Sequence, residues 1–109
     1  MAKNIALTDK VTIATGTTST GLSMTRNRVP VAILTPAALT GTSMTFQASL
    51  DGTNFYDLYN GSTQYSVTVA ASRYIALNPD VFQGVAFIRL VSGSSEAASR
   101  DIYVISGEL

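Results

Sequence analysis

Hydrophobic and polar residues alternate along most of the chain, which is the pattern of β-strands that bury one face. The alternation is clearest over residues 42–50, whose inward face is predicted to carry Met44, Phe46, Ala48 and Leu50. Asp51-Gly52 follows at once, and this dipeptide is a strong signal for a β-hairpin. Residues 55–59 are therefore predicted to return as the partner strand.

The same period of two predicts further strands over residues 11–14, 28–35, 64–69, 73–77, 85–91 and 100–106. Pro30 removes one backbone donor, so its strand is expected to lie at a sheet edge or to carry a bulge. Residues 15–24 and 92–99 are rich in Gly, Ser and Thr and are expected to be loops. Residues 78–82 are expected to form a turn that runs into a single helical turn.

About eight short strands with no sustained helical period predict an all-β fold. We expect an antiparallel β-sandwich in jelly-roll or similar Greek-key order. The length of 109 residues suits a single domain. That domain is expected over residues 11–109, preceded by residues 1–10 as a strand or as an arm that orders against a partner.

The low charge content argues against two classes of partner. Charged residues make up 13% of the chain and the formal net charge is zero, so long-range attraction to polyanions is weak. Nucleic acid and membrane are therefore not expected as partners. No apolar run approaches the roughly 20 residues that a membrane span needs, and the first residues resemble no secretory signal. Synthesis in the cytosol is expected.

The sequence contains neither His nor Cys, which removes the commonest general base and the usual ligands of zinc and haem. Ser and Thr are plentiful, but a nucleophile needs an adjacent base. Paired carboxylates could serve a glycosidase. Asp51 and Asp57 flank one hairpin, but Asp51 already has a role in the turn, which argues against such a pair. We expect no enzymatic activity, no cofactor and no metal site, with an irregular calcium loop at residues 51–57 as a less favoured alternative.

Aromatic residues near the predicted hairpin are the candidates for an interface. Alternation over residues 55–59 places neighbouring side chains on opposite faces, so one face must be partly exposed. Exposed aromatic residues are enriched at protein interfaces, and the absence of Trp makes a protein contact more favoured than a sugar platform. The candidate contact residues are Phe55, Tyr56, Leu58, Tyr59 and Phe87.

Residues 46–58, FQASLDGTNFYDL, resemble the F-x-x-S-x-D-G-x-x-[FW]-x-x-L hairpin of discoidin-like, galactose-binding-like jelly rolls. Residues 73–77 and 85–90 resemble the two strands that follow that hairpin. The resemblance covers about residues 42–90 and implies a jelly-roll fold. The matching positions are turn and core residues, and the family's sugar-binding loops, Trp and Cys have no counterpart here. Carbohydrate binding is therefore an alternative only.

The whole chain resembles small structural proteins of tailed bacteriophages. The similarity rests on the Thr-rich N-terminal half, the Pro36-Ala37-Ala38 turn, the Asp-Gly hairpin and the phrase ASRYIALNP at residues 71–79. It implies a cement (decoration) protein of the virion, often trimeric, that binds the major capsid protein on the outer capsid surface and stabilises the lattice. The alternative is a carbohydrate-binding β-sandwich of a phage tail, fibre or baseplate.

Overall fold

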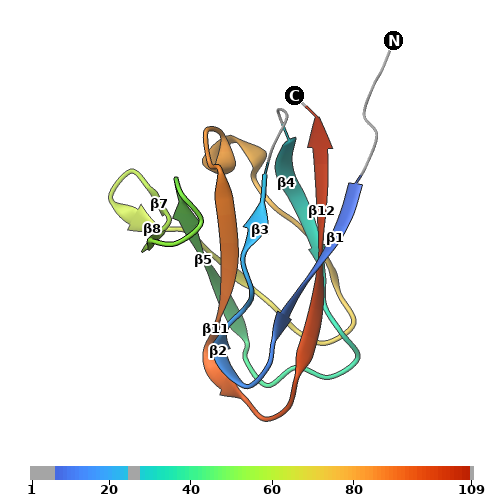
Figure 1. Ribbon diagram of the computed structural model, residues 1–109. Coiled ribbons are helices and arrows are strands. Elements are labelled where there is room, and N and C mark those ends of the chain that lie inside the picture. Colours follow the sequence, from blue (N-terminus) through green and yellow to red (C-terminus); the bar gives the residue numbers. More distant parts are fainter. Residues whose placement is uncertain (1–6, 25–27, 109) are drawn as a thin grey trace.

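The computed structural model describes residues 7–24 and 28–108, which form two facing antiparallel sheets (Figure 1). The first sheet has the order β1 (Leu7–Ile13), β12 (Arg100–Glu108), β4 (Arg28–Leu34) and β10 (Tyr74–Ala76). At the centre of the second sheet lie β11 (Phe87–Glu96) and β5 (Ser43–Ser49). Along the outer side of β11 lie β2 (Gly16–Thr18) and β3 (Leu22–Ser23), and along β5 lie β6 (Phe55–Asp57) and β9 (Ser66–Thr68).

The strand order is that of a jelly roll. β2 and β3 share one position beside β11, and β6 and β9 share one beside β5, so the two sheets contain eight positions. Numbered along the chain, these positions run 1-8-3-6 in the first sheet and 2-7-4-5 in the second. Successive positions thus lie in opposite sheets, except positions 4 and 5, which are neighbours in the second sheet, and this is the order of a double-sheet jelly roll. The predicted all-β, antiparallel jelly-roll sandwich is confirmed.

Two small elements complete the fold. A two-stranded hairpin of β7 (Tyr59–Asn60) and β8 (Thr63–Gln64) projects from the body beside β5 (Figure 1). A single 3₁₀ turn over Pro79–Phe82 is capped by the side chain of Asn78, which accepts a hydrogen bond from the backbone of Asp80. This turn confirms the predicted helical turn. Within residues 7–24 and 28–108, no helix has the length and apolar character that a membrane span requires.

The core lies between the sheets and is centred on three aromatic rings. Phe46 and Phe82 are almost fully buried, and Tyr65 packs against both, with ring centroids 5.2–5.6 Å apart. The two pairs that include Phe82 are edge-to-face, a geometry that adds to the stabilisation from burial alone. The inward residues of the alternating strands surround them: Val11, Ile13, Ile33, Met44, Ile88, Leu90, Ile102 and Val104.

Pro30 coincides with a bulge, as the sequence predicts. Opposite β12, Ala32 pairs with Ile105 and Pro30 pairs with Ser106, so Val31 is an extra residue on β4. β10 pairs with β4 only at residues 32–34, and the missing N–H of Pro30 therefore removes no bond from that ladder.

Both predicted loops were wrong in part. Residues 15–24 include β2 and β3, and β11 continues through residues 92–96 instead of ending at Val91. Ser, Thr and Gly are typical of loops, but here their backbones pair with a neighbouring strand. Thr17 and Thr18 face solvent, whereas Ser92 is buried. β1 also begins at Leu7, so it crosses the expected domain boundary at residue 10. Residues 1–6 of the predicted arm lie outside the described residues.

Candidate interaction surface

Phe55 and Phe87 lie in one row on the outer face of the second sheet, on either side of Ser49. The ring of Phe55 packs under the guanidinium of Arg89, whose carbon lies 4.2 Å from the ring centroid. The ring of Phe87 covers Gly52, where an added Cβ would lie only 3.2 Å from it. Both rings are half-buried by the chain itself, and their main contacts are therefore internal.

Leu58 is a correction to the predicted contact set. Its side chain packs against the core. Its backbone N–H donates to Phe46 and its carbonyl accepts from Tyr65, both at 2.9 Å. These bonds bridge the gap between β6 and β9 along β5. They set Leu58 opposite Phe46, so the two side chains share the inward face of the sheet. Alternation alone placed Leu58 on the same side as Tyr56 without deciding which side is exposed.

Three large apolar side chains of the same segment remain exposed. We call Leu50, Tyr56 and Tyr59 the hairpin patch; their exposed fractions are 87%, 71% and 52%. Leu50 was predicted to point inward, but β5 ends at Ser49 and the chain turns there. Tyr56 lies opposite Ala48 on β5, and Leu50 directly follows the last residue of that strand.

A hydrogen-bonded turn holds the tip of this hairpin in one conformation. One carboxylate oxygen of Asp51 accepts from the backbone N–H groups of Thr53 and Asn54 and from the hydroxyl of Ser49, each at 2.9 Å. These donors, led by the backbone of Asn54, hold the pKa of Asp51 well below its ordinary value. Gly52 has a φ of +79°, which L side chains rarely adopt. Leu50 is thus presented on a pre-formed loop.

The rest of the outer face of the second sheet is polar. Arg89 donates to Gln47 at 2.7 Å, and Gln47 donates to Asp57 at 2.9 Å, which links β11, β5 and β6 in one chain of hydrogen bonds. These three polar side chains are therefore paired with one another. The outer face of the first sheet is different, because Leu34, Tyr74 and Tyr103 are exposed there at 37%, 67% and 40%.

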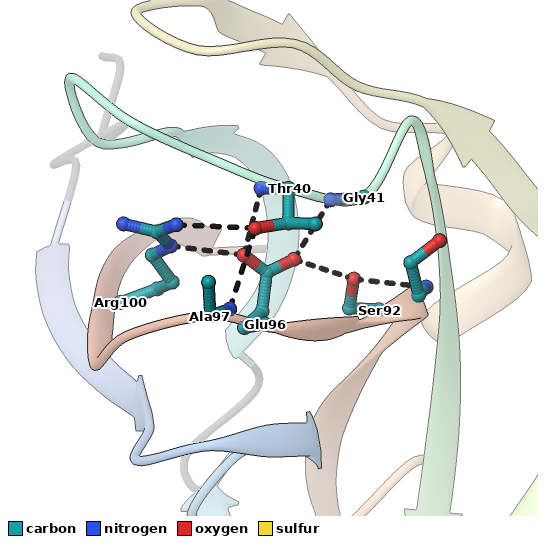
Figure 2. Close-up of polar contacts among 7 residues, drawn as sticks. Thr40, Gly41, Ser92, Glu96, Ala97 and Arg100 are labelled. Carbon is teal, nitrogen blue, oxygen red and sulfur yellow. Dashed lines mark hydrogen bonds and ion pairs between the residues drawn. The ribbon is translucent and has the colours of Figure 1, made fainter.

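Glu96 is the one fully buried carboxylate of the described residues, and sequence reasoning missed it (Figure 2). Its two oxygens accept from the backbone N–H of Thr40 and of Gly41, at 2.8 and 2.9 Å. They also accept from the hydroxyl of Ser92 at 2.7 Å and from the guanidinium of Arg100 at 2.9 Å. The carboxylate ties the loop before β5 to the β11–β12 hairpin.

The surroundings of Glu96 keep it ionised. Burial alone would raise its pKa, but the bonds from Thr40, Ser92, Arg100 and Gly41 outweigh burial and lower the pKa from 4.5 to about 2. Gly41 allows the close approach, because a Cβ there would lie 2.2 Å from the hydroxyl oxygen of Ser92. The four donors hold the residues before β5, the end of β11 and Arg100 together, which gives this cluster a structural role. Alternation gave no signal for Glu96, because Ser94, which lies between Ser92 and Glu96 in the same series, is exposed and the pairing of β11 with β2 shifts register there.

The described residues hold no cluster of three or more acidic, His or Cys side chains that could bind a metal ion, and they enclose no pocket. In the loop considered for calcium, Asp51 uses its carboxylate to accept hydrogen bonds from its own turn. The surfaces that stand out are therefore the hairpin patch and the outer face of the first sheet. No known family model matches this chain, and no curated protein matches it significantly.

Proposed function

We propose that this protein is a non-enzymatic structural component of a tailed-bacteriophage virion. In this role it is a cement protein that binds the outer surface of the capsid and stabilises the lattice of the major capsid protein. The hairpin patch is the observation that carries the proposal. Water-exposed Leu50, Tyr56 and Tyr59 are costly for an isolated domain, and aromatic side chains of this kind form the centres of protein interfaces.

The rigidity of the hairpin supports the same role. Because Asp51 fixes the loop, little conformational entropy remains to be lost when Leu50 docks. A ligand that binds the assembled shell, but not its dissociated subunits, stabilises the shell by mass action. A compact jelly roll with a pre-formed contact loop meets this need without any chemistry.

We expect the chain to be present on the outer surface of virions of the phage that encodes it, as seen by cryo-electron microscopy. Added back to particles that lack it, the wild-type protein should raise the temperature at which the capsid opens. The double variant Leu50→Ser/Tyr56→Ser should bind these particles about tenfold more weakly or worse, because it removes two central apolar contacts. Binding can be measured by co-sedimentation.

Leu7→Ser is the matched control, since Leu7 is also an exposed apolar residue but lies on the first sheet. It should bind particles as the wild type does. Absence of the chain from purified virions would refute the cement role. Equal binding by the double variant and the control would refute the assignment of the hairpin patch as the contact.

A second candidate function is glycan binding at a phage tail, fibre or baseplate. The exposed rings of Tyr56 and Tyr59 favour it, because tyrosine faces can stack on sugars and polar Asp57 and Asn60 lie next to them in the chain. Under this alternative a glycan array should show saturable binding that Tyr56→Ala abolishes. The same array should show no binding if the protein is a cement protein.

A further inference from the structure

The β7–β8 hairpin, which projects beside β5 (Figure 1), closes through a tight turn. Asn60 pairs with Thr63, so Gly61 and Ser62 are the two central residues of this turn. Gly61 has a φ of +68°, whereas Ser62 stays outside the positive-φ region. This is the pattern of a type II′ turn, in which the N–H of the first central residue makes no bond within the turn.

The peptide unit between Asn60 and Gly61 is exposed and has no internal partner. Both residues lie on the surface. Within residues 7–24 and 28–108, no hydrogen bond involves the side-chain amide of Asn60 or the backbone N–H of Gly61. The space around the Gly61 Cα is open, since an added Cβ would meet no atom within 4 Å. The Gly61 nitrogen is therefore free to approach the side-chain carbonyl carbon of Asn60.

We propose that Asn60 is a site of spontaneous deamidation, in which Gly61 supplies the attacking nitrogen. The backbone nitrogen of Gly61 forms a bond to Cγ of Asn60, and the side-chain NH₂ leaves as ammonia with the proton that the Gly61 nitrogen gives up. Water then opens the resulting succinimide ring. Attack of water at Cγ leaves an aspartyl residue at position 60, and attack at the backbone carbonyl carbon leaves an isoaspartyl residue. Water is the only co-reactant.

The turn at Asp51 shows how the same chemistry is blocked elsewhere in the chain. Asp51 also precedes a glycine, but the N–H of Gly52 donates to the hydroxyl of Ser49 at 2.8 Å. The carboxylate of Asp51 accepts hydrogen bonds from its own turn. These bonds keep it ionised, and an ionised carboxylate is a poor target for a nucleophile. Neither reacting group of Asp51-Gly52 is free, although the dipeptide alone is prone to this reaction.

Two other asparagines of the described chain are protected for different reasons. The side chain of Asn78 accepts a hydrogen bond from Asp80, and the next residue is Pro79, whose nitrogen carries no proton to give up. The side-chain amide of Asn54 donates to Asp51 at 3.1 Å. These two positions are internal controls for Asn60.

Deamidation would alter the hairpin patch, because Tyr59 directly precedes Asn60. It adds a negative charge there, and an isoaspartyl linkage adds one carbon to the backbone, which disturbs the pairing of Tyr59 with Gln64. This consequence alone rests on the proposed cement role. Asn60→Asp should bind particles about threefold more weakly or worse, since a carboxylate within an apolar contact must lose its water. Equal binding by Asn60→Asp and wild type would refute only this consequence, whereas wild type that does not bind refutes the cement role.

Tandem mass spectrometry of the folded protein, held for weeks at mildly alkaline pH, tests the modification itself. Position 60 should gain the mass of an amide-to-acid exchange at least about tenfold faster than positions 54 and 78. Electron-transfer fragmentation should detect isoaspartate at position 60 and none at position 51. In urea, where the Asp51 turn is lost, position 51 should form isoaspartate as well. Asn60→Gln is the matched control, because its longer side chain would have to close a six-membered ring, which forms far more slowly.

Circular dichroism before and after the incubation verifies that the protein stays folded. An Asn60 that remains intact in the folded protein would overturn the proposal. So would equal rates at positions 60 and 78, because the nitrogen of Pro79 cannot react in this way.

Discussion

Glu96→Ala is expected to lower the free energy of unfolding by about 3–5 kcal/mol, with a fall in Tm of more than about 10 °C. The substitution removes the acceptor for four donors at once, from Thr40, Gly41, Ser92 and Arg100. The Arg100 guanidinium, only 14% exposed, would lose its carboxylate partner. Because small domains are stable by about 5–15 kcal/mol, this loss is a large part of the total. Urea unfolding at pH 7 measures it.

The carboxylate of Glu96 should also make the free energy of unfolding depend on pH. The pKa of Glu96 is about 2 in the folded protein and 4.5 as its ordinary value, so ionised Glu96 favours folding. Its contribution, about 3 kcal/mol by linkage, is complete above pH 4.5 and is lost as the pH falls toward 2. Glu96→Gln keeps the shape but cannot ionise, so its urea midpoint should change less over this pH range. An equal acid slope in wild type and Glu96→Gln would contradict the assignment.

Phe46→Ala is expected to cost about 3–5 kcal/mol, because it leaves a cavity at the centre of the core. The ring is fully buried and its centroid lies 5.6 Å from that of Tyr65 and 5.2 Å from that of Phe82. Neither neighbouring ring can move in without leaving its own contacts, since they also pack on each other at 5.5 Å. The midpoint of urea unfolding, monitored by far-ultraviolet circular dichroism, reports the loss.

Tyr56→Ala is the control for this core substitution. Tyr56 is also aromatic and lies on the partner strand of β5, but it is 71% exposed. Its replacement should change the free energy of unfolding by less than about 0.5 kcal/mol. Similar losses in Phe46→Ala and Tyr56→Ala would mean that the two rings are equally buried, contrary to the structure.

The alternation of hydrophobic and polar residues along the sequence was enough to predict which side chains face the core between the two sheets. A strand has a side-chain period of two, so Met44, Phe46, Ile102 and Val104 could be assigned to the core without knowing which strands pair. The Asp51-Gly52 turn and the helical turn at residues 79–82 were equally readable, because local backbone chemistry fixes both. The outward positions of Tyr74 and Tyr103 also follow from that period, since both lie beside inward residues.

Only the tertiary structure decided which apolar side chains remain exposed to solvent and that the carboxylate of Glu96 is buried. Leu50 continues the inward series but lies beyond the end of β5, whereas Leu58 packs against the core because the β5–β6 pairing sets it opposite Phe46. Glu96 stands in a Ser-rich stretch that is typical of a loop. Its four donors come from the chain around residues 40–41 and from residues 92 and 100. Alternation along a strand is local, but exposure and hydrogen bonding depend on what the rest of the chain brings to the same place.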